Sequence, residues 1–108
     1  MIRTVCGWLF AMIVLLSSGA GSAWAHKVNL FAYVEGERVF TESYFPDGKK
    51  VEGGTIEVRD ASGTKLLEGK TDSQGLFSFP LPKKEDLTIT LDASMGHKNS
   101  YILKKSEM

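Results

Sequence analysis

The sequence has very little of the chemistry on which redox and cofactor sites usually depend. Of its 108 residues, only one is cysteine, two are histidine and three are proline. Thirteen basic side chains balance thirteen acidic ones, so the chain lacks the basic excess of a nucleic-acid-binding surface. We therefore expect no nucleic-acid partner. The length allows one small domain and excludes a large multidomain enzyme.

Long apolar runs are absent after the first 25 residues. Near the N-terminus, Arg3 precedes an apolar run of about 12 residues, 5–16, which is shorter than the roughly 18 expected of a membrane-spanning helix. Residues 23–25 then supply the small-x-small motif that signal peptidase recognises. This pattern predicts a helical signal peptide over 1–25 and an exported, periplasmic or otherwise extracytoplasmic domain over 26–108, with no membrane span of its own.

Catalytic motifs are weak or missing. The single cysteine, Cys6, lies in the predicted signal peptide, so the mature domain has no thiol, disulfide or thiolate metal site. A nucleophilic triad needs a base, and only two histidines could serve. The glycines at 53–54 and 63 fall between predicted strands, with no helix N-terminus to bind a phosphate. We expect a protein that is not an enzyme.

The apolar residues of the mature domain repeat with a period of two, which is typical of β-strands. Turn residues such as Pro, Asp and Gly separate the alternating segments at short intervals. The pattern predicts seven strands, near residues 28–34, 38–45, 55–59, 65–70, 76–81, 87–91 and 101–103, with a loop over 92–99. Pro80 and Pro82 predict that the fifth strand ends there or runs along an edge. We therefore expect a small antiparallel β-sandwich of immunoglobulin-like or transthyretin-like type.

Aromatic residues alternate along the predicted strands. Packing in the core or half-buried positions explains them most simply, and a ligand-binding stripe is the alternative. The set consists of Phe31, Tyr33, Phe40, Tyr44, Phe77 and Phe79.

The two histidines are the best candidates for a binding site. Cleavage after Ala25 would make His26 the N-terminal residue, so that one residue carries both a free α-amine and an imidazole. Both groups have ordinary pKa values of about 6.5 to 8, so they lose a proton to a metal at little cost near neutral pH. His97 lies on the predicted last loop, beside the thioether of Met95, and the fold can bring this loop close to the N-terminus. Such a nitrogen-rich set suits nickel or copper better than calcium or magnesium.

Several segments of the mature chain carry a resemblance to a known family, namely 26–36, 43–49, 54–58, 66–72, 75–79, 86–87 and 95–98. In these segments the chain resembles NikL-type proteins, which are accessory components of energy-coupling-factor nickel and cobalt transporters. The most specific parts of this resemblance are Ala-His-Lys at 25–27 and Met-Gly-His-Lys at 95–98. The middle portion also resembles carboxypeptidase regulatory-like and other transthyretin-like sandwich modules.

The resemblance implies an exported accessory domain of a nickel or cobalt uptake system. Its partners would be the membrane permease subunits, and its cargo a nickel or cobalt ion. Two alternatives stay open, a periplasmic copper-binding sandwich and a structural or interaction module without metal.

The signal-peptide hypothesis makes a direct prediction about processing. We expect the exported protein to begin at His26, because the peptidase motif ends at Ala25. Intact mass or N-terminal sequencing of the protein recovered outside the cytoplasm measures this. A mature start at any other residue would remove the proposed amine and imidazole pair.

Overall fold

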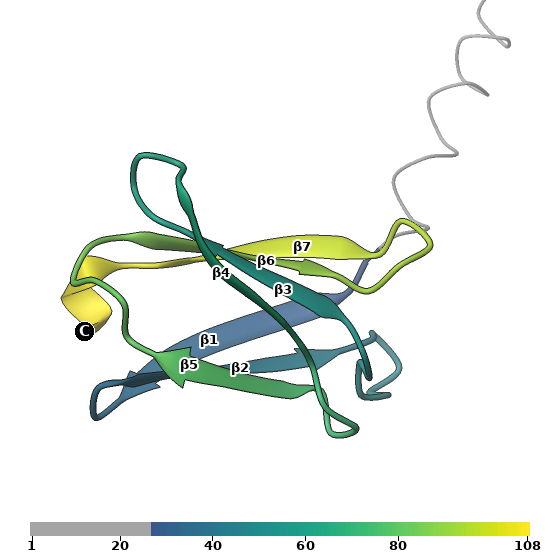
Figure 1. Ribbon diagram of the computed structural model, residues 1–108. Coiled ribbons are helices and arrows are strands. Elements are labelled where there is room, and N and C mark those ends of the chain that lie inside the picture. The colour runs from purple at the N-terminus through teal and green to yellow at the C-terminus, as the bar shows by residue number, and fades with distance from the viewer. Residues whose placement is uncertain (1–26) are drawn as a thin grey trace, which may run out of the picture.

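The computed structural model describes residues 27–108, and the predicted signal peptide and His26 lie outside the described residues. The elements in this range, in chain order, are β1 (Asn29–Glu35), β2 (Arg38–Tyr44), β3 (Thr55–Arg59), β4 (Lys65–Lys70), β5 (Leu76–Pro80), β6 (Leu87–Asp92), β7 (Lys98–Leu103) and the 3-10 turn η1 (Lys105–Glu107) (Figure 1). The predicted all-β class with seven strands is confirmed. Apart from η1, residues 27–108 form no helix, and nothing in this range provides an apolar helix that could span a bilayer.

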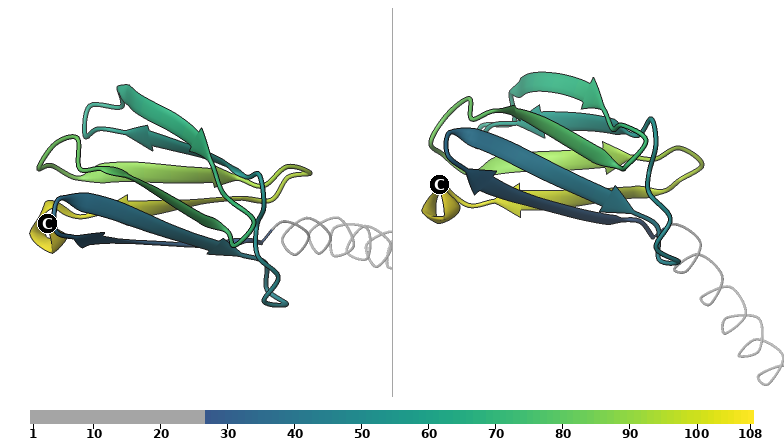
Figure 2. Two further views of the ribbon diagram at one scale, coloured as in Figure 1. Left: turned by 60° about the horizontal axis from the view of Figure 1, so that its bottom comes forward. Right: turned by 90° about the horizontal axis from the view of Figure 1, so that it is seen from below.

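The strands form two antiparallel sheets. One has the order β1-β2-β5 and the other the order β4-β3-β6-β7. The two sheets lie face to face as the layers of a sandwich (Figure 2). The edge strands β1 and β7, one from each sheet, lie beside each other along one side of the sandwich. The β-sandwich predicted from the period-two pattern is therefore the fold of this chain.

The strand boundaries lie within one residue of the sequence prediction except at the start of β7, and two of the differences have a clear cause. β2 ends one residue early, because the Phe45 N–H turns away to donate to the Lys49 carbonyl at 2.8 Å. β7 begins at Lys98, inside the predicted loop, because the Ala93 N–H donates to the His97 carbonyl at 2.8 Å and closes a tight connection. The loop after β6 is therefore shorter than expected, and it holds His97 at the base of β7.

The inward positions of both sheets meet in a single apolar core. Alternation puts every second residue of a strand on the same face, so one strand contributes only half of its residues to this core. The buried apolar side chains are Val28, Leu30, Ala32, Val39, Val51, Ile56, Val58, Phe79, Leu87, Ile89, Leu91 and Leu103. Phe77 shares the inward face with Phe79, and their ring centroids are 5.9 Å apart. A Cβ atom at Gly69 would lie only 2.2 Å from the Phe77 ring, which is too close for a contact. Glycine at this position of β4 therefore leaves room for the ring.

Four turns share one local design, in which an aspartate caps the backbone that follows it. The Oδ1 atom of each aspartate accepts the N–H two residues later, and a glycine with positive φ completes the turn. The pairs are Asp47 with Lys49, Asp60 with Ser62, Asp72 with Gln74, and Asp92 with Ser94. The glycines are Gly48, Gly63, Gly75 and Gly96. Each of these turns is formed by residues close together in the sequence, so the positions of its turn residues predict it well.

The edge of the three-stranded sheet at β5 offers little free backbone. At its start, the Asp72 N–H donates to the Leu76 carbonyl at 2.9 Å, and Asp72 Oδ1 accepts the Leu76 N–H at 3.0 Å. At its end, Pro80 has no N–H to donate. The strand ends at Pro80 and lies at the sheet edge, as the two prolines predict.

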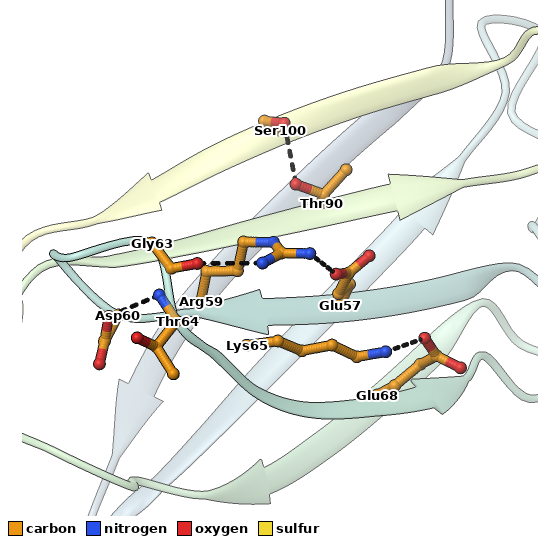
Figure 3. Close-up of polar contacts among 9 residues, drawn as sticks. All are labelled: Glu57, Arg59, Asp60, Gly63, Thr64, Lys65, Glu68, Thr90 and Ser100. Atoms are coloured by element: carbon orange, nitrogen blue, oxygen red, sulfur yellow. Dashed lines mark hydrogen bonds and ion pairs between the residues drawn. The ribbon is translucent and has the colours of Figure 1, made fainter.

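The outer face of the four-stranded sheet is mostly polar, although Ile102 of β7 is exposed on it. Its neighbouring side chains pair with one another, as Figure 3 shows. The contacts are an Arg59–Glu57 ion pair, a Lys65–Glu68 ion pair at 2.7 Å and a Thr90–Ser100 hydrogen bond at 3.2 Å. Exposed pairs of this kind add little stability, but they leave a surface that water solvates well.

Asp60 ties two loops at one end of the sandwich. Its side chain is 4% exposed, and its Oδ2 accepts the Lys83 ammonium at 2.9 Å. Its Oδ1 accepts the N–H groups of Ser62 at 3.0 Å and Thr64 at 2.9 Å. The Lys83 hydrogen bond, with smaller contributions from Ser62 and Thr64, holds the pKa of the Asp60 carboxyl well below its usual range. The loop after β3 and the loop before β6 are thereby fastened to one carboxylate.

This carboxylate makes stability depend on acidity. The folded pKa lies below the unfolded value of about 3.9, so the ionised group stabilises the fold above about pH 4, and this contribution is lost as the pH falls below that value. We expect Asp60→Asn to lower the free energy of unfolding at pH 7 and to flatten its decline in acid. Urea unfolding between pH 2.5 and 7 measures both. Asp47→Asn is the control, because Asp47 makes only a local turn bond. Equal effects of the two substitutions would contradict the prediction.

Candidate functional site

The first described residues of the chain lie against the start of β7. Lys27, Val28 and Asn29 line one surface pocket together with Lys98 and Asn99, with a volume of about 320 Å³. The Asn99 Nδ2 donates to the Val28 carbonyl at 2.8 Å and joins the two segments. These residues are 71 positions apart in sequence. The N-terminal end of the domain therefore meets the end of the β6–β7 turn.

The β6–β7 turn has an unusual backbone. Ser94, Met95 and Gly96 have φ values of 70°, 52° and 83°, so three consecutive residues are left-handed. Only glycine adopts this region freely, and the left-handed conformation costs other residues about 1–2 kcal/mol each. Asp92 offsets part of this cost by accepting the Ser94 N–H at 2.9 Å. The turn is closed further by the His97 N–H, which donates to the Ser94 carbonyl at 3.0 Å.

Met95 and His97 occupy different environments on this turn. Met95 is 87% exposed and points its thioether into solvent. His97 is half-buried, and its ring meets the ring of Phe45 edge to face, with centroids 5.5 Å apart and an interplanar angle of 80°. Phe45 follows β2, so His97 lies against the connection between the two sheets. The imidazole is held by packing, while the thioether is open to a ligand.

Of the three predicted metal ligands, the structure describes two, Met95 and His97. Among residues 27–108, no group of three or more His, Cys, Asp or Glu side chains is arranged to hold a metal ion. Met95 and His97 share one turn, and His26 lies outside the described residues, one position before Lys27. A complete metal site would therefore need ligands beyond those of the described range.

A second surface feature lies on the outer face of the three-stranded sheet. Phe31, Tyr33 and Tyr44 are 48%, 36% and 40% exposed, and Phe40 beside them is half-buried. Packing in core or half-buried positions therefore explains Phe40, Phe77 and Phe79 but not the exposed Phe31, Tyr33 and Tyr44. The signal was present in the sequence, because Phe31 and Tyr33 alternate out of phase with the buried residues of β1.

Comparisons with known proteins supply no family for this chain. No family model matches it, and no solved structure matches it. It is 29% identical over 84 residues to an uncharacterized protein of Haemophilus influenzae (strain ATCC 51907 / DSM 11121 / KW20 / Rd), which is 75% of this chain and 52% of the relative. The chain thus spans about half the length of the curated relative it matches.

The Asn99 side chain bonds to Val28 and also accepts the Ser100 N–H at 2.8 Å, and Asn99→Ala removes both bonds. We expect this change to speed amide hydrogen exchange at residues 27–30, which reports on the Val28 bond, and to lower the free energy of unfolding by about 1–2 kcal/mol, since one hydrogen bond contributes roughly 1 kcal/mol net. Hydrogen exchange followed by NMR measures the first effect and urea unfolding the second. Asn29→Ala is the control, because the exposed Asn29 side chain forms no hydrogen bond within residues 27–108. Unchanged hydrogen exchange in Asn99→Ala would show that the Asn99–Val28 hydrogen bond does not hold the N-terminal end of the domain.

Proposed function

We propose that this protein is an exported accessory domain of a nickel or cobalt uptake transporter. In this proposal the mature N-terminus and the β6–β7 turn receive the metal ion and pass it to the membrane permease subunits. The resemblance to NikL-type proteins suggests the system, and the chemistry of His26, Met95 and His97 suggests the cargo.

One observation carries the proposal, the meeting of the N-terminal end with the β6–β7 turn. The Asn99–Val28 hydrogen bond places the second described residue beside the base of β7, two positions from His97. His26 is two positions before Val28, and two residues of extended chain span about 7 Å at most. The α-amine and imidazole of His26 therefore have a short path to the turn that carries Met95 and His97.

The donor set matches late first-row metals. Imidazole and amine nitrogens favour nickel, cobalt and copper, whereas carboxylate and carbonyl oxygens favour calcium and magnesium. The exposed thioether of Met95 adds a soft ligand, and soft ligands favour copper in its reduced state. This feature keeps a copper-binding sandwich as the second candidate.

The test removes one proposed ligand at a time from the mature protein. We expect His97→Ala to weaken nickel binding, measured by calorimetric titration, by about tenfold or more, since even outer-shell changes at metal sites cost 10- to 100-fold. One residue added before His26 should have a similar effect, because it converts the α-amine into a peptide amide. The matched control carries the same residue after Met108.

Titration with three metals separates the candidates. Nickel or cobalt binding that both changes weaken supports the transport role. Copper binding that exceeds both, and that falls in Met95→Leu, would favour the copper-binding alternative. Full affinity in both variants, or no binding of any of the three metals, would contradict a metal function at this end.

A further inference from the structure

The outer face of the three-stranded sheet presents aromatic rings in ordered rows. Strand register places Tyr33, Phe40 and Ser78 in one row across β1, β2 and β5, and Phe31, Glu42 and Leu76 in the next. Cross-strand neighbours in such rows lie about 5 Å apart, so their side chains touch. This face therefore differs from the mostly polar outer face of the other sheet.

The rings form a continuous stripe. The centroids of Phe31 and Tyr33 are 5.9 Å apart, and those of Tyr33 and Phe40 are 5.5 Å apart with an interplanar angle of 18°. Tyr101 of β7 extends the stripe past the β1 edge, with its centroid 5.8 Å from that of Phe31. Single exposed apolar residues are ordinary on a protein surface, but a contiguous patch of this kind marks an interaction site.

A single carboxylate lies within this apolar surface. Glu42 is half-buried, and its side chain forms no ion pair or hydrogen bond with any residue in the described range. Register puts it between Phe31 and Leu76, and the alternation of β2 puts Phe40 and Tyr44 on either side. A carboxylate partly withdrawn from water without a partner is unfavourable, so this position favours a cation from outside the chain.

The cations near Glu42 are engaged elsewhere. Arg38 lies on the same face of β2 but about 13 Å along the strand, and its Nε donates to Ser78 Oγ at 3.1 Å. Lys70 donates from Nζ to Thr55 Oγ1 at 2.7 Å. Neither side chain forms an ion pair with Glu42.

A groove beside the stripe gives a ligand room to reach this carboxylate. Its volume is about 470 Å³, and its lining includes Tyr33, Phe40, Glu42, Leu76 and Ser78. Lys70 and Asp72 also line it and carry opposite charges, and the Asp72 carboxylate accepts the backbone N–H groups of Gln74 and Leu76. The groove thus combines aromatic rings with the Glu42 carboxylate, which has no partner in the described range.

We propose that this groove binds an arginine or lysine side chain presented by a segment of a partner protein. The cation contacts the Glu42 carboxylate, and the rings of Tyr33 and Phe40 attract it through their electron-rich faces. The apolar part of the partner segment covers Phe31 and Leu76. This inference goes beyond the proposed function and does not depend on it, since no metal takes part.

The experiment uses two peptides of nearly the same shape, one charged and one neutral. Acetyl-Gly-Arg-Gly-amide and its neutral citrulline analogue are titrated into the isotope-labelled protein and followed by NMR. We expect the arginine peptide to shift the signals of Tyr33, Phe40 and Glu42 and to bind about 3- to 30-fold more tightly than the citrulline peptide. Glu42→Gln should remove most of this difference.

Matched variants and a second ligand class complete the test. Glu35→Gln is the control, because Glu35 is an exposed carboxylate at the end of β1, outside the groove. Tyr33→Leu, checked for folding by circular dichroism, should weaken the arginine peptide while keeping an apolar surface. Equal binding of the two peptides, or an equal effect of Glu35→Gln and Glu42→Gln, would overturn the proposal. Tighter binding of the neutral oligosaccharide cellohexaose, unaffected by Glu42→Gln, would also overturn it and assign the rings to a glycan.

Discussion

The constraint on which this structure depends is the alternation of side chains along each strand. Once Val39, Thr41 and Ser43 of β2 are buried, the residues between them must face away from the core. The same reasoning applies to every strand of a two-layer sandwich. The outer faces are therefore free to differ, and in this chain one is mostly polar while the other is aromatic.

The outer faces of the two sheets offer different surfaces to a partner protein. Ion pairs and hydroxyl contacts occupy much of the four-stranded sheet, and Ile102 is its one large apolar side chain that is strongly exposed among residues 27–108. The three-stranded sheet concentrates its exposed rings around one carboxylate. The metal-site hypothesis concerns a different region, the end of the sandwich where β1 starts and the β6–β7 turn meets Phe45. Two separate surfaces would let one small domain receive an ion and contact a protein at the same time.

The fold was predictable because its signals are local. The period of two needs only neighbouring residues, and so do the turns that begin at Asp47, Asp60, Asp72 and Asp92. The out-of-phase position of Phe31 and Tyr33 was equally visible, although core packing was the simpler explanation for aromatic residues.

Contacts between distant segments could not be predicted in this way. The Asn99–Val28 hydrogen bond, the Phe45–His97 ring contact and the Asp60–Lys83 ion pair each join residues that only the completed sandwich brings together. The isolation of Glu42 is of the same kind, because it depends on the register of β2 with two neighbouring strands. The sequence has equal numbers of acidic and basic residues, and these numbers give no sign that the Glu42 carboxylate lacks a partner in the described range.

The closed edge at β5 has a consequence for the behaviour of the protein at high concentration. A sheet that shows aromatic rings to water is at risk of growing by addition of strands from other molecules, which leads to fibres. Asp72 occupies the backbone groups of Leu76, and Pro80 removes a donor, so a new strand finds few partners at this edge. Contacts with other molecules are then favoured on the flat of the sheet, where the rings lie, over the backbone of the β5 edge.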